Sequence, residues 1–474
     1  MYDTNMKMVS TRDKSRKAYS YTDVLISGLA PDGGLYVPLE YPKFSQDELK
    51  IIANATYPEI VFAVKKRLVN GAIPDIELKK IIDSAYSESF DKENNTIVPV
   101  SEIEPGLFLQ NLSLGPTASF KDMALQILGK EIKYELARRK EKLTILGATS
   151  GDTGSAAEAA MKGLPNIKLF ILSPEKGMSK FQRAQMGNLT GDNIFNISIR
   201  GTFDDCQDLV KQIKRGHEFS HLGAVNSINW GRISSQIPYY FAGYFQTVKK
   251  VGEPIDVTVP SGNFGNMLSA YIAKRMGLPI RRLIVATNEN NVLDTLFKTG
   301  VYERKTIQVT SSPSMDISKA SNYERLVFDI FKGDAELVKK YMAEFAKTGR
   351  VSLTDYGLDK DIFIKLGFGS GNSTHKDRLA TIKHIYEKSA VVIDPHTADG
   401  VFVGRKHMKS DNVPMLCMGT ALPVKFEETV EEAIGFIPKR PERFLELENS
   451  TRENCFEVMD VNSDILKEFL KSHI

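Results

Sequence analysis

The sequence predicts an α/β fold with doubly wound, mostly parallel sheets, and three observations lead to this prediction. Short apolar runs alternate with helical patterns from about residue 143 onward, as in chains whose strands are joined by crossover helices. Several of these runs end in loops rich in glycine and hydroxyl residues. The composition, with 42% hydrophobic and 26% charged residues in a chain of 474, is that of an ordinary globular protein.

The first hundred residues mix helical patterns with turn signals, and we expect them to form an added N-terminal domain, residues 1–100. Asp32-Gly33-Gly34 is the clearest turn, because glycine tolerates positive φ and aspartate can bond its own backbone. A short apolar run, Leu35–Pro38, follows it. Apolar residues with helical spacing then extend from Asp47 to Asn70, with a break expected near Pro58.

Residues 101–474 are expected to form a catalytic α/β region of two subdomains. Strands are predicted at Leu143–Gly147, Ile167–Leu172, Ile194–Ile199, Ile255–Val259 and Leu283–Ala286, with further apolar runs at Val391–Ile393 and Met415–Met418. Helices are predicted at Asp152–Lys162, Asp204–Lys214, Trp230–Lys250 and Phe264–Arg275, and Pro238 should start or kink the third. The glycine-rich stretch Gly367–Gly371 is interpreted as a loop. Ligands of such sheets bind beyond the carboxyl ends of strands, so the strand-to-helix loops should carry the chemistry.

Charge and cysteine content argue against several classes of protein. Lys plus Arg is 62 and Asp plus Glu is 59, so the net charge of +3 gives no reason to expect nucleic acid or a membrane as partner. The three cysteines lie far apart and form no CxxC pair, which fits a reducing compartment. Without an apolar signal segment or a run of about 18 apolar residues, we expect a cytoplasmic protein. The seven histidines show no metal-binding spacing, so no metal is expected.

The sharpest loop is Pro260–Asn266, which follows one predicted strand and opens a helix. Its glycines let backbone N–H groups approach an anion, and the helix N-terminus adds a partial positive charge. Phosphate is therefore a natural ligand, although a tight turn with no ligand is an equally good interpretation of this loop alone. It matches neither the Walker pattern nor the dinucleotide pattern.

Two further features involve a second loop and a lysine. Gly147–Gly154 offers hydroxyls and backbone donors suited to a carboxylate or phosphate, although Asp152 taken alone is better explained as a helix cap. Lys121, in Ser119-Phe120-Lys121-Asp122, taken alone would be an ordinary surface lysine. A buried lysine with a lowered pKa can instead form a Schiff base. Together with a phosphate loop, it suggests pyridoxal phosphate, which carries both an aldehyde and a phosphate.

Seven motifs in order carry a resemblance to a known family: Asp32–Pro38, Ser119–Asp122, Thr149–Gly154, Asn226–Arg232, Ser261–Asn266, Ser314–Ser318 and Gly419–Ala421. Together they resemble threonine synthase, a family of pyridoxal-phosphate enzymes with the tryptophan-synthase-β fold, called fold type II. The resemblance spans nearly the whole chain. It implies that residues 101–474 bind pyridoxal 5'-phosphate.

The resemblance also implies roles for the cofactor residues. Lys121 would form the internal aldimine with the cofactor, and Thr420 would hydrogen-bond its pyridine nitrogen. A neutral hydroxyl partner leaves that nitrogen largely unprotonated. The cofactor phosphate would be held by the loop residues Gly262, Asn263, Phe264, Gly265 and Asn266.

The implied substrate is O-phospho-L-homoserine, which with water gives L-threonine and phosphate. Its α-carboxylate would be received by Thr149, Ser150, Gly151, Asp152 and Thr153. Arg232 and Lys425 are the candidates for its phosphate, with ordinary surface charge as the alternative for Lys425. The partner is thus a small molecule, and the chain is expected to be a monomer or small homo-oligomer.

The chain departs from the family pattern at three places. Leu422 stands where the family often has histidine, so no role is transferred to that position. Pro313–Ser318 and Ala320–Asn322 also differ from the usual residues. These departures leave two alternatives open: a related pyridoxal-phosphate enzyme that eliminates phosphate and releases a keto acid, or a non-catalytic binding protein that has kept the fold.

Overall fold

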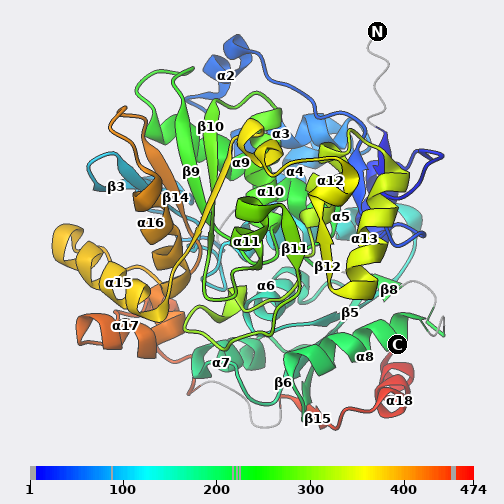
Figure 1. The fold of residues 1–474 in the computed structure, drawn as a ribbon. Helices are drawn as coiled ribbons and strands as arrows, with labels where there is room; N and C mark the ends of the chain where they lie inside the picture. The colour runs from blue at the N-terminus through cyan, green and yellow to red at the C-terminus, as the bar shows by residue number, and fades with distance from the viewer. Residues whose placement is uncertain (1–6, 87–88, 216–217, 220–221, 224–225, 450–454) are drawn as a thin grey trace.

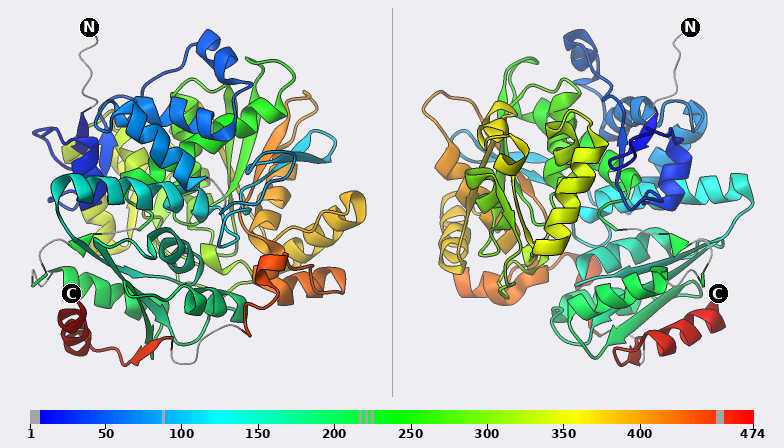
Figure 2. Two further views of the ribbon diagram at one scale, coloured as in Figure 1. Left: turned by 180° about the vertical axis from the view of Figure 1, so that it is seen from behind. Right: turned by 45° about the vertical axis from the view of Figure 1, so that its right-hand side comes forward.

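The computed structural model describes residues 7–86, 89–215, 218–219, 222–223, 226–449 and 455–474. Two sheets with helices on their faces form the molecule, as Figures 1 and 2 show. This confirms the predicted doubly wound, mostly parallel α/β fold. The strands of the larger sheet are, in order, β13 (Phe368–Asn372), β10 (Ile280–Thr287), β9 (Ile255–Pro260), β14 (Met415–Gly419), β4 (Leu107–Asn111) and β3 (Val100–Glu104). Only β3 in this sheet pairs antiparallel.

The smaller sheet is parallel throughout its described strands. Its order is β15 (Glu457–Met459), β7 (Ile194–Ile199), β6 (Ile167–Pro174), β5 (Leu143–Ala148) and β8 (Leu222–Gly223). Two short antiparallel pairs complete the described strands: β1 (Met8–Ser10) with β2 (Tyr36–Pro38), and β11 (Val301–Glu303) with β12 (Arg350–Ser352).

Helices cover both sheets. Those before β5 are α1 (Tyr21–Ser27), α2 (Gln46–Ile52), α3 (Tyr57–Val69), α4 (Asp75–Ala85) and α5 (Lys121–Arg139). The middle of the chain adds α6 (Asp152–Met161), α7 (Lys180–Asn188), α8 (Phe203–Arg215), α9 (Trp230–Thr247), α10 (Gly265–Arg275) and α11 (Val292–Thr299). The later helices are α12 (Tyr323–Ile330), α13 (Ala335–Thr348), α14 (Asp361–Lys365), α15 (His375–Ser389), α16 (Pro395–His407), α17 (Glu427–Ile434) and α18 (Ser463–His473). Short 3-10 helices are η1 (Pro313–Met315), η2 (Leu353–Tyr356), η3 (Pro423–Phe426) and η4 (Glu442–Phe444). No helix in the described part of the chain is long and apolar enough to cross a membrane.

Two prolines show that the local preference of a residue determines the backbone at one position and that packing overrides it at another. Pro58 lies in the first turn of α3, and the helical pattern breaks before it as predicted. Pro238 neither starts nor interrupts α9, which continues through it. The removed N–H of a proline inside a helix costs about 3 kcal/mol, and the burial of α9 among α3, α5 and α10 offsets that cost.

The prediction of a loop at Gly367–Gly371 is wrong, because Phe368–Asn372 forms the edge strand β13. The glycines serve close packing there. A Cβ on Gly371 would lie 2.8 Å from Val403 Cγ1, and one on Gly369 would lie 3.0 Å from Ile284 Cδ1. At Val391–Ile393 no strand forms, and the chain leads directly into α16.

The N-terminal segment packs on the rest of the chain through one continuous apolar core that includes residues on both sides of residue 100. Helices α3 and α4 lie against α9 and α5 respectively. The division into domains at residues 1–100 and 101–474 stays a prediction.

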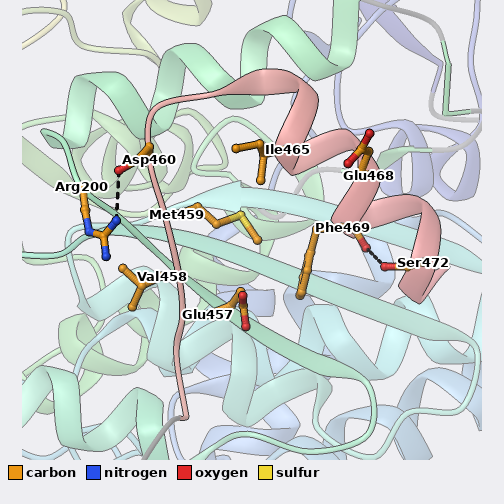
Figure 3. Close-up of a pocket in the computed structure, with 9 residues that line it drawn as sticks. All are labelled: Arg200, Glu457, Val458, Met459, Asp460, Ile465, Glu468, Phe469 and Ser472. Carbon is orange, nitrogen blue, oxygen red and sulfur yellow. Dashed lines mark hydrogen bonds and ion pairs between the residues drawn. The ribbon is translucent and has the colours of Figure 1, made fainter.

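The C-terminal segment covers the far edge of the smaller sheet. Strand β15 pairs with β7, and Phe469 of α18 packs its ring against Phe170 and Phe195. Figure 3 shows a surface depression between β15 and α18, beside which Arg200 pairs with Asp460 at 3.2 Å. None of the predicted site residues lines it.

A buried ion pair joins the N-terminal segment to two central helices. Lys65 of α3 and Glu131 of α5 are fully buried, with Lys65 Nζ 2.8 Å from Glu131 Oε1. The same Nζ donates to the hydroxyls of Tyr21, at 2.6 Å, and of Ser234 on α9, at 3.1 Å. Burial lowers the pKa of Lys65, and the Glu131 carboxylate opposes that shift.

We expect Lys65→Met to lower the free energy of unfolding by about 3–5 kcal/mol, because it leaves the carboxylate of Glu131 buried without its ion-pair partner. Adding Glu131→Leu should recover most of the loss, since an apolar pair of similar volume replaces the ion pair. Urea denaturation of the two variants and the wild type measures both effects. A single variant as stable as the wild type would contradict this account.

Candidate active site

The loops predicted to hold the cofactor start from three neighbouring strands of the larger sheet. Strand β14 lies between β9 and β4, with Cys417 opposite Thr258 and Gly419 opposite Asn111. All three strands are parallel, so the loops that follow them leave the same edge of the sheet. The Gly147–Gly154 loop comes from β5 of the other sheet and meets them from the opposite side.

Lys121 is the first residue of α5, and the loop before it is tied to the end of β14. The N–H of Phe120 donates to the carbonyl of Thr420 at 2.8 Å, and Ser119 forms an isolated bridge with Ala421. Asp122 accepts from the backbone N–H of Thr117, at 2.8 Å, and from its hydroxyl, at 2.7 Å. Burial raises the pKa of Asp122 to about 6, although both hydrogen bonds oppose the rise. Lys121 and Thr420 are therefore fixed side by side.

A buried carboxylate between two lysines is the central electrostatic feature. Asp152 Oδ2 lies 3.3 Å from Lys121 Nζ, and Asp152 Oδ1 lies 2.8 Å from Lys425 Nζ. Gln182 Nε2 also donates to Oδ1, at 2.9 Å. Burial opposes ionisation of Asp152, but the two ammonium groups and the Gln182 hydrogen bond hold its pKa well below the usual range.

The pKa of Lys121 is lowered by the same surroundings. Burial is the largest cause, and the positive charges of Arg232 and Lys425 add to it, while the Asp152 carboxylate raises the pKa. A lowered pKa increases the fraction of Lys121 present as the free amine, the form that acts as nucleophile or base.

The hydroxyl of Thr149 and the glycines of the loop determine the conformation of the backbone around Asp152. Thr149 Oγ1 accepts from the N–H groups of Gly151, at 3.0 Å, and Gly154, at 2.8 Å. Gly151 has φ of 133°, where a Cβ would lie 2.7 Å from Gln182 Cδ. Ser150 is exposed and Thr153 half-buried, so their hydroxyls are the accessible ones. Asp152 is the first residue of α6 rather than its cap, which is Gly151.

The loop after β9 has the backbone of an anion site. Phe264 precedes α10 with φ of 62°, in the left-handed region. A Cβ on Gly262 would lie 3.0 Å from Met315 Cα, and one on Gly265 would lie 3.2 Å from Asn322 Nδ2, so a larger side chain at either position would require these neighbours to shift. The first N–H groups of α10 have no intrahelical acceptor, and they carry the positive end of the helix dipole.

Two buried side chains at this edge have polar atoms without a hydrogen-bond partner in the described part of the chain. The hydroxyls of Tyr239 and Tyr240 both donate to Asn266 Oδ1, which leaves Asn266 Nδ2 unpartnered. Thr420 Oγ1 is unpartnered as well. Since buried polar groups are normally hydrogen-bonded, both atoms point to a missing ligand.

The residues therefore fit pyridoxal phosphate. The cofactor's aldehyde needs a buried amine, its phosphate needs backbone and side-chain donors at a helix N-terminus, and its ring nitrogen needs a polar partner. Lys121, the 262–266 loop with Asn266 Nδ2, and Thr420 Oγ1 supply these three requirements at one edge of the sheet.

The two predicted phosphate-binding cations are both buried. Burial lowers the pKa of Arg232 to about 10, and Arg232 lies near enough to influence the charge of Lys121. Lys425 donates to the carbonyl of Thr117 at 2.9 Å as well as pairing with Asp152. Lys425 is thus a buried residue of the site rather than an ordinary surface charge.

Two site residues carried no role in the sequence analysis. Ser314 of η1 donates from Oγ to Asp152 Oδ2 at 3.3 Å, and Gln182 of α7 donates to the other oxygen. Ser314 belongs to one of the motifs that carry the resemblance and could have been found there, whereas nothing in the sequence marks Gln182. Leu422 is half-buried beside η3, in an apolar cluster with Phe181 and Val424. Within the described ranges, no group of His, Cys, Asp and Glu could hold a metal ion.

Comparisons with known proteins identify the family of the chain. Three family models match: "Threonine synthase N terminus" at residues 7–86, "Pyridoxal-phosphate dependent enzyme" at 92–352, and "Threonine synthase, C-terminal" at 397–470. A threonine synthase of Methylobacillus glycogenes is 46% identical, over 99% of this chain and all of the relative. That of Saccharomyces cerevisiae is 38% identical, over 90% of this chain and 88% of the relative.

Solved structures give the same result. The crystal structure of a pyridoxal-phosphate-bound threonine synthase from Brucella melitensis superposes with a TM-score of 0.92 at 38% identity, covering 99% of both chains. The yeast threonine synthase structure has a TM-score of 0.91 at 34% identity, again covering 99% of each chain. The chain described here belongs to the threonine synthase family of pyridoxal-phosphate-dependent enzymes.

Proposed function

We propose that this chain converts O-phospho-L-homoserine and water to L-threonine and phosphate, as a carbon–oxygen lyase of threonine biosynthesis, with Lys121 as its catalytic residue. The observation that carries the proposal is the Lys121 amine, whose side chain is only 12% exposed and which lies 3.3 Å from the Asp152 carboxylate. The N–H of the preceding Phe120 bonds the Thr420 carbonyl, which brings the Lys121 and Thr420 segments together. When bound, pyridoxal phosphate supplies a conjugated ring that absorbs the negative charge left by removing a proton from a substrate carbon.

Three parts of the chain would hold the cofactor. The backbone N–H groups of Gly262, Asn263, Phe264, Gly265 and Asn266 would bind its phosphate together with Asn266 Nδ2, and Thr420 Oγ1 would bond its ring nitrogen. Support comes from the loop's position at the N-terminus of α10 and from the two buried atoms without a hydrogen-bond partner in the described part of the chain. Lys121 completes the set as the residue that binds the aldehyde.

Lys121 would also move the protons of the reaction. Its Nζ, as a free amine, would accept the proton from Cα of the substrate, and it must release that proton before it can accept one from Cβ. The lowered pKa of Lys121 favours the free amine, and Asp152 fixes the direction of the Nζ through their 3.3 Å contact.

The substrate's two anionic groups would bind at different places. Its α-carboxylate fits the exposed hydroxyl of Ser150, the backbone of Gly151 and the hydroxyl of Thr153. The carboxylate of Asp152 repels another carboxylate, so within this loop we assign Asp152 to holding the two lysines, and Thr149 to shaping the turn. Arg232 and Lys425 would bind the substrate phosphate, because their buried positive charges exceed the single charge of Asp152.

Beyond the site, we propose that the enzyme acts in the cytoplasm on this small molecule, as a monomer or small homo-oligomer, without nucleic acid or membrane as partner. The support is the near-neutral charge of the chain and the absence of a membrane-spanning helix from its described residues.

Lys121→Ala should remove both the visible absorbance of the bound cofactor and the formation of threonine, because no other amine takes the position of Nζ. We expect the turnover to fall by at least about 10³-fold, the scale of losing a positioned base. The measurement is an absorbance spectrum and identification of the amino-acid product after incubation with O-phospho-L-homoserine. The exposed Lys388→Ala is the control and should behave as wild type.

The product also decides between the proposed reaction and its rivals. Threonine from the wild type supports the proposal, whereas a keto acid as the main product would identify the related phosphate-eliminating enzyme. A colourless protein that shows no spectral change with pyridoxal phosphate would identify the non-catalytic binding protein instead.

Two variants should move the pKa of Lys121 in opposite directions. Arg232→Gln removes a positive charge that lowers this pKa, so it should rise, and Asp152→Asn removes the negative charge that raises it, so it should fall. The pH dependence of reductive methylation of Lys121 in cofactor-free protein, followed by mass spectrometry, measures both shifts. Methylation of Lys388 in the same sample is the internal control.

Arg232→Gln should also raise the KM for O-phospho-L-homoserine by about ten- to a hundredfold, the effect of losing a charge-assisted hydrogen bond to phosphate. Shifts of the Lys121 pKa in the same direction for both variants, or an unchanged KM, would remove the corresponding residue from its assigned role.

A further inference from the structure

A buried aspartate outside the predicted set connects to both halves of the site. Asp394 is the N-cap of α16 and is fully buried. Its Oδ1 accepts from the backbone N–H of His396 and lies 2.9 Å from His396 Nδ1. Its Oδ2 accepts from the backbone N–H and the hydroxyl of Thr397. Each carboxylate oxygen of Asp394 therefore binds one neighbouring residue: Oδ1 binds His396 and Oδ2 binds Thr397.

The first arm of hydrogen bonds leads through Thr397 to Thr420. Because the Thr397 hydroxyl proton is given to Asp394, its oxygen is left to accept, and it receives the backbone N–H of Thr420 at 3.1 Å. This bond fixes the backbone at the end of β14, from which the unpartnered Thr420 Oγ1 projects.

The second arm leads through His396 to Lys121. His396 Nε2 accepts the backbone N–H of Ser314 at 3.0 Å, so Nε2 is unprotonated and the ring proton is on Nδ1, facing Asp394. The ring packs on Phe426, with centroids 4.7 Å apart. Ser314 Oγ in turn donates to the Asp152 oxygen that contacts Lys121. The same 3-10 helix η1 packs on the phosphate loop through Met315 and Gly262.

We propose that Asp394 is a positioning residue that aligns Thr420 through Thr397 and the Asp152–Lys121 pair through His396 and Ser314. This inference rests on the proposed function. It assigns to one carboxylate the relative placement of the ring-nitrogen partner and the catalytic lysine, which come from separate parts of the chain. Asp394 itself touches neither Thr420 Oγ1 nor Lys121, so it acts only through these bonds.

Asp394→Asn separates the two arms chemically. Both carboxylate oxygens accept two hydrogen bonds each, but an asparagine has one accepting oxygen and one donating amide nitrogen. The amide nitrogen must therefore face donors on one side, at His396 or at Thr397, so one arm is released whichever way the amide turns. Asp334→Asn, at the N-cap of α13 and far along the chain from the site, is the matched control because asparagine caps helices as well as aspartate.

The experiment measures the dissociation constant of pyridoxal phosphate by equilibrium dialysis of the full-length protein, and the melting temperature of each variant. Asp394→Asn should weaken cofactor binding by about ten- to a hundredfold, the effect of losing one charge-assisted hydrogen bond, while Asp334→Asn leaves it unchanged. Thr397→Val should also weaken binding at least about tenfold, and Thr397→Ser, which keeps the hydroxyl, should restore it. The methylation midpoint of Lys121 should stay unchanged in Thr397→Val but shift in His396→Gln, because only the second arm reaches Lys121.

Cofactor binding within about twofold of wild type in both Asp394→Asn and Thr397→Val, or equal weakening in Thr397→Ser and Thr397→Val, would overturn the inference. If Asp394→Asn does not fold, the dissociation constants of pyridoxal phosphate in Thr397→Val and Thr397→Ser test the inference in its place. The proposed function fails separately, when Lys121→Ala still forms threonine or the wild type forms none.

Discussion

The structure depends on one buried carboxylate shared by two lysines. Lys121, Lys425 and Arg232 place three positive charges in the site, and Asp152 supplies the negative charge that two of them contact directly. Burying cations without such a partner would be costly, so Asp152 makes the cluster tolerable. It leaves an excess of positive charge, which suits the proposed binding of phosphate, and the charges of Arg232 and Lys425 help to lower the pKa of Lys121.

The charged cluster lies where loops from the two sheets come together. Lys121, Thr420 and the 262–266 loop leave adjacent strands of the larger sheet, so sheet register sets their spacing. Asp152 comes from the smaller sheet, and the packing of α6 on α5 places it relative to Lys121. Ser314 of η1, after β10, and Lys425, after β14, add side-chain contacts to Asp152 from the larger sheet. The hydrogen bonds that lead from Asp394 to Ser314 support this second set of contacts.

The parts of the fold that local chemistry controls could be predicted from the sequence. The strand-to-helix loops at Gly147–Gly154 and Pro260–Asn266, and the start of α3 at Pro58, follow from glycine, proline and apolar periodicity. Where packing outweighs local preference, the local signals misled: α9 does not start at Pro238 but continues through it, and Gly367–Gly371, predicted to be a loop, lies in an edge strand because its glycines allow α16 to approach closely. The contacts that Ser314 and Gln182 make with Asp152 could not be predicted from spacing, because these hydrogen bonds join residues 30 and 162 positions apart.

The N-terminal segment contributes to the site without entering it. Lys65 of α3 bonds Glu131 on α5 and Ser234 on α9, and these are the helices whose first turns carry Lys121 and Arg232. Because Lys65 bonds both α5 and α9, it restrains the rotation of one helix relative to the other. A rotation of either helix would break a buried hydrogen bond or ion pair. The distance between the amine of Lys121 and the guanidinium of Arg232 determines how far one lowers the pKa of the other. The buried pair at Lys65 therefore fixes the two helices whose first turns carry Lys121 and Arg232.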